Sequence, residues 1–161
     1  MTVKEYNQCV EDFSDNVYRF ILKNIKDEEK AKDIVQDTYE KLWVRAEEVT
    51  YKKAKSYIFT TAYHTMIDTI RKDSKVTDIN EVNNIEPSTN KQYTGLNEIL
   101  EQALNRLPDI QRSVVLLRDY EGYSYEEIGQ ITNLNESQVK VYIYRARLAL
   151  KKFIGSLETV L

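Results

Sequence analysis

The chain has 161 residues and a net charge of −3, with only four glycines and two prolines. This charge excludes a generally basic protein that coats nucleic acid, so any DNA contact must come from local patches. A single cysteine, Cys9, excludes an intrachain disulfide. The sequence has no apolar signal core and no apolar run of the about 20 residues that a membrane span needs. We expect an all-helical cytoplasmic protein with no membrane insertion.

The first helix is expected over residues 7–25, where apolar residues recur every three or four positions. A second helix should run from residue 27 to about residue 48, because acids at its start complement the helix dipole. Its outer face carries Asp33, Gln36, Asp37 and Glu40. These side chains are either solvated or form a ridge that docks on a basic partner, and the pattern alone favours solvation. Trp43 is expected to pack in the core.

A basic connector, residues 49–56, leads into a third helix expected to end at residue 72. Between Lys52 and Lys72 there are five basic residues and one acid. The exposed stripe of this helix consists of Lys53, Tyr57, Thr60, His64, Asp68 and Arg71. Aromatic rings among cations suit unpaired bases, but rings that only cover neighbouring helices give the same pattern, so both interpretations stay open. His64 is the only histidine, and we expect no metal site, cofactor or catalytic triad.

Residues 73–95 lose the apolar period and are rich in Asn, Ser, Thr and acids. At 23 residues, this stretch is too long for an ordinary connection within a compact domain. We expect an acidic, flexible linker between two small helical domains, residues 1–72 and residues 96–161.

Apolar periodicity resumes at Leu96 and predicts a four-helix C-terminal domain, which makes the whole fold all-α. The expected helices cover residues 96–107, 109–120, 125–132 and 136 to about 153.

Two capping boxes mark the end of this domain. Ser124 with Glu127, and Asn135 with Gln138, have the spacing at which the cap side chain and the third helical residue exchange hydrogen bonds. They predict a short helix, a turn and a long helix. This helix-turn-helix arrangement places its second helix in the DNA major groove.

The last helix has an apolar side and a basic side. Its apolar stripe consists of Val139, Ile143, Ala146 and Leu150. Residues 136–155 include five basic residues and one acid, whereas residues 96–135 include three basic residues and seven acids. A basic face alone would suit a solvated bundle helix, but together with two capping boxes it favours DNA binding.

Three segments resemble the sigma factors of bacterial RNA polymerase. AKDIVQDTYEKLW (31–43) resembles the signature of region 2, and SYIFTTAYHTMIDTIRK (56–72) is similar to the promoter-melting segment that adjoins it. ALNRLPDIQRSVVLLRDYEGYSYEEIGQITNLNESQVKVYIYRARLALKKF (103–153) resembles region 4. Region 3 is replaced by the linker, a layout similar to the extracytoplasmic-function (ECF) type. The resemblance covers roughly residues 7–72 and 96–155.

The resemblance implies a non-enzymatic subunit that binds core RNA polymerase, recognises and opens promoter DNA, and pairs with an anti-sigma factor. Docking on the clamp helices of the largest polymerase subunit would use Asp33, Gln36, Asp37 and Glu40. Minus-ten recognition and opening would use Lys53, Tyr57, Thr60, Tyr63, His64 and Arg71. Minus-thirty-five recognition would use Glu136, Ser137, Gln138, Lys140, Val141, Tyr144 and Arg145. The last domain would also meet the polymerase flap, and the linker would run toward the active site and the RNA exit path.

The chain departs from the family pattern at several positions. Relatives commonly have Arg-Asn where this chain has Tyr63 and His64, which leaves open the base that is captured there. Gly129 stands where Ala is usual, a small-for-small change that costs a helix interior about 1 kcal/mol. Gln138 and Tyr142 imply a different promoter sequence rather than a loss of DNA binding.

Two other functions are compatible with part of the sequence. A stand-alone helix-turn-helix regulator would bind duplex DNA as a dimer, but no heptad or exposed apolar stripe offers a clear dimer interface. An adaptor under anti-sigma control would bind polymerase without starting transcription. Run-off transcription with core enzyme separates the three, because only a sigma factor starts transcription and needs core to do so.

Overall fold

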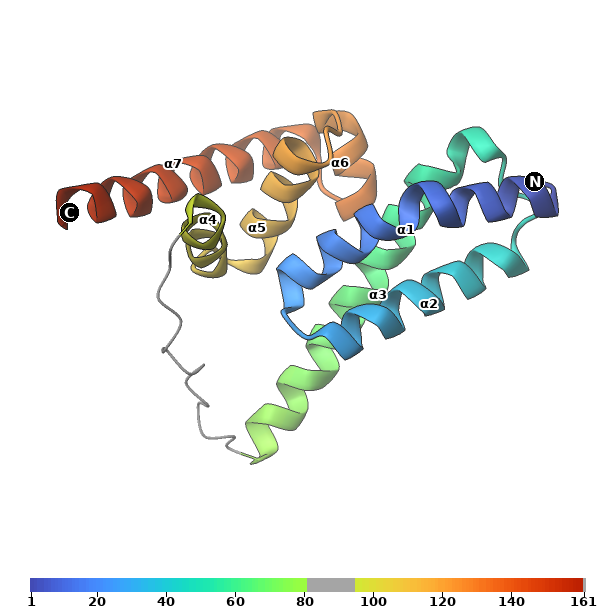
Figure 1. Ribbon diagram of the computed structural model, residues 1–161, viewed down its shortest axis with the longest axis horizontal. Coiled ribbons are helices and arrows are strands. Elements are labelled where there is room, and N and C mark those ends of the chain that lie inside the picture. The colour runs from blue at the N-terminus through green and yellow to red at the C-terminus, as the bar shows by residue number, and fades with distance from the viewer. Residues whose placement is uncertain (81–94, 161) are drawn as a thin grey trace.

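A computed structural model describes the backbone of residues 1–80 and 95–160, and the side chains of residues 1–75 and 95–156. Every regular element in these ranges is a helix, as the sequence predicts (Figure 1). The N-terminal half contains α1 (Val3–Ile25), α2 (Glu28–Val44) and α3 (Tyr51–Asn80). The C-terminal half contains α4 (Leu96–Asn105), α5 (Asp109–Val115), the π-helix η1 (Leu116–Tyr120), α6 (Tyr125–Thr132) and α7 (Glu136–Val160). The all-α, two-domain fold class is thus confirmed.

The three N-terminal helices pack on one another around a shared core. Helix α1 begins four residues before its expected start, because Thr2 and Glu5 form a capping box there. The chain turns at Lys26, which has a positive φ of 54°, and Asp27 caps α2 by accepting from the Lys30 amide. The largest fully buried side chains of this half belong to Phe20, Ile21, Leu42, Ile58, Phe59 and Met66.

The ends of α2 and α3 differ from those expected. Helix α2 stops at Val44 rather than near residue 48, whereas α3 starts inside the basic connector and continues to Asn80. The first eight residues of the expected linker, 73–80, are therefore helical. Within this extension, Asp73 pairs with Lys30 of α2 and ties the two helices together. The rest of the expected linker, up to residue 94, lies outside the described residues, as does its route toward the polymerase active site.

In the C-terminal half, α4, α5 and α6 all pack against α7. Pro108 is the N-cap residue of α5, and the helix expected over residues 109–120 divides into α5 and η1. Leu116, Leu117, Ile128, Ile131 and Ile143 are fully buried at the centre of this half.

The two halves are in contact. Helix α3 lies against α6, and α1 lies against α5, so the buried side chains of both halves form one continuous cluster (Figure 1). The C-terminal part of α3 extends away from this contact (Figure 1).

Candidate nucleic-acid interface

The helix-turn-helix is built by hydrogen bonds close in sequence. Ser124 and Glu127 form the expected capping box at the start of α6. The side chains of Asn135 and Gln138 each accept from the other residue's amide, at 2.8 and 3.0 Å, which confirms the second box. Between the two helices, Asn133 adopts the left-handed conformation with φ 60° and ψ 39°. These bonds set where α7 begins.

The turn passes so close to Gly129 that a side chain at this position would force the backbone to shift. A Cβ atom at Gly129 would lie 2.7 Å from the carbonyl oxygen of Leu134, closer than such contacts occur. The amides of Asn133 and Leu134 both donate to the Gly129 carbonyl. The expectation of a small-for-small change was therefore wrong, because the turn folds back directly over the glycine.

The outer face of α7 is open to solvent. All seven side chains expected to read the minus-thirty-five element are exposed: Glu136, Ser137, Gln138, Lys140, Val141, Tyr144 and Arg145. Tyr144 is the most exposed of the large apolar ones, at 68%, whereas Val139, Ile143 and Ala146 on the other side are buried. Lys140 and Glu136 lie 3.5 Å apart at the first turn. The exposed face of α7 thus carries two cations, a side-chain amide and an aromatic ring, and these groups suit contact with a DNA groove: Lys140, Arg145, Gln138 and Tyr144.

A cation cluster beside this face was not expected from the sequence. Arg147 donates to both carboxylate oxygens of Asp119, at 2.6 and 3.1 Å. The Arg118 guanidinium lies 4.6 Å, and the Lys140 ammonium 5.7 Å, from the centroid of the Tyr125 ring. These contacts fasten α7 to η1 and α6. Motif spacing in the sequence does not predict these contacts, because Asp119 and Arg147 are 28 residues apart.

The minus-ten residues expected on α3 divide into two groups. Lys53, His64 and Arg71 are exposed, and Tyr57 and Thr60 are half-buried on the same side. Tyr63 is only 6% exposed and faces inward, with burial raising the pKa of its hydroxyl. In this arrangement the ring of Tyr63 is not accessible to a base, and its expected role in minus-ten recognition stays a prediction.

The polar ridge on α2 lies where expected. Asp33, Gln36 and Glu40 are exposed, and half-buried Asp37 pairs with Lys41 at 2.9 Å. Gln36 donates to Glu40 at 3.4 Å, so the ridge is ordered by bonds along the helix.

Trp43, in contrast, is not in the core. It is 54% exposed and rests edge to face on Tyr6, with ring centroids 5.0 Å apart. The expectation of core packing was wrong, because at the last turn of α2 the ring packs on Tyr6 at one edge and leaves more than half of its surface exposed. Trp43 and Val44 therefore add an apolar end to the ridge.

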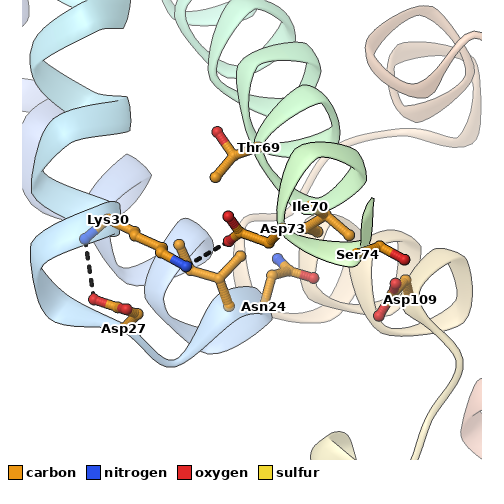
Figure 2. A pocket seen from close by; sticks show the side chains of 9 residues that line it. Asn24, Asp27, Lys30, Thr69, Ile70, Asp73, Ser74 and Asp109 are labelled. Atoms are coloured by element: carbon orange, nitrogen blue, oxygen red, sulfur yellow. Dashed lines mark hydrogen bonds and ion pairs between the residues drawn. The ribbon is translucent and has the colours of Figure 1, made fainter. Parts of the chain in front are cut away.

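A polar pocket lies where α1 ends and α2 begins, against the middle of α3 and the start of α5 (Figure 2). Figure 2 shows the Lys30 side chain reaching to Asp73, with Asn24 and Asp109 on the side of the C-terminal half. The ion pair of Lys30 with Asp73 joins α2 to α3 inside this pocket, which fits a structural joint.

Comparisons with known proteins identify the family. The family pattern Sigma-70 region 2 matches residues 9–76, and Sigma-70, region 4 matches residues 97–150. RNA polymerase sigma factor YlaC of Bacillus subtilis is 37% identical over 133 residues, which cover 77% of each chain. RNA polymerase sigma factor SigV of the same organism is 30% identical over 86% of this chain and 84% of its own. ECF RNA polymerase sigma factor SigM is 29% identical over 94% of both chains.

The chain belongs to the ECF family of RNA polymerase sigma factors. The sigma factor RpoE of Bartonella quintana, solved in complex with the anti-sigma factor NepR, has a similar fold, with a TM-score of 0.82. That match covers 95% of this chain and 98% of RpoE at 25% identity. The two family matches correspond to the two halves of this sigma factor. They do not favour the alternative function, a stand-alone helix-turn-helix regulator that binds duplex DNA as a dimer. Within the described residues, no helix combines the length and apolar character of a membrane span.

Proposed function

We propose that this sigma factor binds core RNA polymerase through α2 and contacts promoter DNA through α3 and α7, without catalysing a reaction itself. The observation that carries this division is the charge of the three surfaces. The α2 ridge presents Asp33, Gln36 and Glu40 to solvent, whereas the exposed faces of α3 and α7 are basic. The acidic ridge suits a basic protein surface, and the two basic faces suit phosphate.

Helix α7 is the proposed reader of the minus-thirty-five element. Lys140, Tyr144 and Arg145 stand on its solvent side near its N-terminus, where recognition helices contact base edges. The C-terminal half would also meet the polymerase flap.

Helix α3 is the proposed site for the opened minus-ten strand. Its exposed stripe supplies Lys53 and Arg71 for phosphate and Tyr57 and His64 for stacking. Capture of unstacked bases would hold the promoter open without nucleotide hydrolysis.

The domain limits and partners are part of the same proposal. Region 2 would occupy residues 1–72 and region 4 residues 96–161, with the linker between them; α3 continues from region 2 into the linker as far as Asn80. An anti-sigma factor is proposed as a partner because the similar RpoE was solved with NepR. We place the factor in the cytoplasm, where it would find polymerase and promoters.

Run-off transcription with purified core enzyme tests this function. The complete factor should start transcription at specific sites only when core is present. The isolated chain should bind duplex DNA weakly and lose that binding as salt increases, because its net charge is −3. Tight binding to a palindromic duplex without core would contradict the proposal.

Paired variants test the division of labour. Lys140→Ala or Arg145→Ala should weaken minus-thirty-five binding by about 1–3 kcal/mol and leave core binding intact. Asp37→Ala with Glu40→Ala should weaken core binding and leave intact the DNA binding of the isolated chain. The same defect in both sets would refute the assignment of surfaces.

A further inference from the structure

The side chain of Lys41 in α2 reaches across to α3. Its ammonium donates to the Thr65 hydroxyl oxygen at 3.2 Å and lies 2.9 Å from a carboxylate oxygen of Asp37, one turn earlier in α2. Both members of the ion pair remain partly in water, with 50% of the Lys41 side chain and 44% of the Asp37 side chain exposed. The ammonium therefore lies between the proposed polymerase-binding ridge of α2 and the proposed DNA-binding helix α3.

The pair of Asp37 and Lys41 lies between two grooves, since both side chains line each of them. One groove lies between α2 and the second half of α3 and extends to Lys72. The other groove is also lined by Tyr57 and Arg45. Tyr57 is one of the rings proposed to stack on bases of the opened strand. A backbone phosphate next to such a base would enter the groove that Lys41 lines.

The carboxylate of Asp37 neutralises the charge that Lys41 would otherwise offer to DNA. The two residues are spaced i, i+4 on one helix, and exposed pairs of this kind are weak enough to exchange partners. The bond to Thr65 does not depend on this pair, because Thr65 belongs to α3. If another cation paired with Asp37, the Lys41 ammonium would therefore stay beside α3 and lose the acid that neutralises it.

Another lysine of α2 shows what is particular to Lys41. Lys32 pairs with Glu29 at 4.0 Å, and the two side chains are 61% and 86% exposed. The groove that Lys32 lines is formed with Tyr18 of α1, on another side of the helix. Lys32 thus has the same chemistry in the same helix, but it lies beside α1 instead of beside the proposed DNA-binding surface.

We propose that Lys41 is a further phosphate contact of the minus-ten surface, and that Asp37 neutralises its charge until a cation of polymerase pairs with Asp37. The inference rests on the proposed roles of α2 and α3. Polymerase would release Lys41 from the carboxylate, while Thr65 would keep the ammonium beside α3. One acid of the core-binding ridge thus controls one cation of the DNA-binding surface, so core binding and DNA binding strengthen each other.

Asp37→Asn mimics the polymerase-bound state in the full chain alone, because it removes the carboxylate charge and keeps the size of the side chain. The matched control, Glu29→Gln, makes the same change in charge beside Lys32 on the same helix. Each variant is also combined with Lys41→Gln, which removes the ammonium. Affinity for labelled poly(dT) is measured by fluorescence anisotropy at several salt concentrations, and circular dichroism confirms that each variant retains its helices.

Asp37→Asn should bind poly(dT) roughly two- to fivefold more tightly than Glu29→Gln, so loss of this acid strengthens DNA binding rather than impairing it. Its logarithmic dependence on salt should be steeper by about 0.7, because one more phosphate is contacted. Adding Lys41→Gln should abolish both changes, whereas adding Lys32→Gln should leave both in place. The loss caused by Lys41→Gln should therefore be larger when Asp37 is replaced than when it is present.

Equal poly(dT) affinities for Asp37→Asn and Glu29→Gln would overturn the proposal. Survival of the gain after Lys41→Gln would also overturn it, because the effect would then come from the lost carboxylate alone. An equal loss from Lys41→Gln with Asp37 present or replaced would show that Asp37 does not control the lysine. These measurements need no polymerase. Failure of the proposed function is therefore a separate result, seen as absent run-off transcription by the unchanged chain with core.

Discussion

Helices α3 and α7 both present basic faces, but only α7 presents all of its expected contact residues to solvent. The most exposed large ring of α7, Tyr144, is 68% exposed, whereas Tyr63 of α3 is 6% exposed. The outer face of α7 is set by caps within a few residues of it. The accessible face of α3 depends on where the other half of the molecule lies.

The comparison shows that, of the two proposed DNA-binding helices, α7 has its contact face open to solvent and α3 has part of its contact face buried. On α7, the acid nearest to Lys140 is Glu136, one turn away on an exposed surface. On α3, the acid facing Lys55 is Glu121, which comes from the C-terminal half. Only the second arrangement can be changed by moving the two halves apart.

The largest effect should come from deleting the ring that joins both halves. Phe59 lies between Phe20 and Tyr123, with centroids 5.8 and 5.3 Å away. Phe59→Ala should lower the free energy of unfolding by about 3–5 kcal/mol, measured by urea denaturation. Tyr144→Ala is the control on α7 and should change stability by no more than about 0.5 kcal/mol. If Phe59→Ala and Tyr144→Ala lowered the free energy of unfolding by similar amounts, the two rings would not differ in how much they contribute to packing.

A smaller effect should follow from adding a methyl group to the helix-turn-helix. Gly129→Ala gains about 1 kcal/mol of helix propensity but must push Leu134 away, which costs about 1–3 kcal/mol. We expect a net loss of stability in thermal unfolding and weaker minus-thirty-five binding. Gly155→Ala is the control, because a Cβ atom at Gly155 would meet nothing within 4 Å. It should stabilise α7 by about 0.5–1 kcal/mol. Stabilisation by both variants would show that the turn is less constrained than its geometry indicates.

Removal of the cap of α7 should have a similar or smaller effect. Asn135→Ala loses the side-chain oxygen that accepts from the Gln138 amide at 2.8 Å and should destabilise the protein by about 1 kcal/mol. Asn97→Ala, an exposed change on α4, serves as the control in the same denaturation experiment. If the two variants unfold alike, α7 is positioned by its packing rather than by local bonds.

The smallest effect should be the pH dependence of the contact that Glu121 makes between the two halves of the molecule. In the closed state, with the two halves packed together, burial raises the pKa of Glu121 above its ordinary value of 4.5. The closed state therefore binds a proton more readily than an open state in which the halves have separated. Closure should therefore be strongest below about pH 4.5 and weaken as pH rises through the raised pKa. The radius of gyration should increase with pH in this range, and Glu121→Gln should abolish the change. An equal change in that variant would assign the effect to other groups.

Some features could be predicted because their causes are close in sequence. The capping boxes at Ser124 and Asn135 join residues three apart, and the buried stripe of α7 follows from helical periodicity. The same locality explains the ordered α2 ridge.

Other features escaped prediction because their causes are distant. The ion pair of Lys30 with Asp73 spans 43 residues and accompanies the extension of α3 into the expected linker. Trp43 is exposed at the end of α2, and how much of it α1 covers depends on tertiary packing that the periodicity of α2 does not give. Gly129 is constrained by a turn whose path could not be read from the residue itself.

By itself, the sequence determined the helical fold, the helix-turn-helix and the family, because caps, periodicity and motif spacing act within a few residues. The tertiary structure alone decided which face of α3 is accessible. That choice depends on Phe59 meeting Tyr123 and on Lys55 facing Glu121, contacts between residues more than sixty positions apart. Burial of those groups is a property of two packed surfaces, and no single segment encodes it.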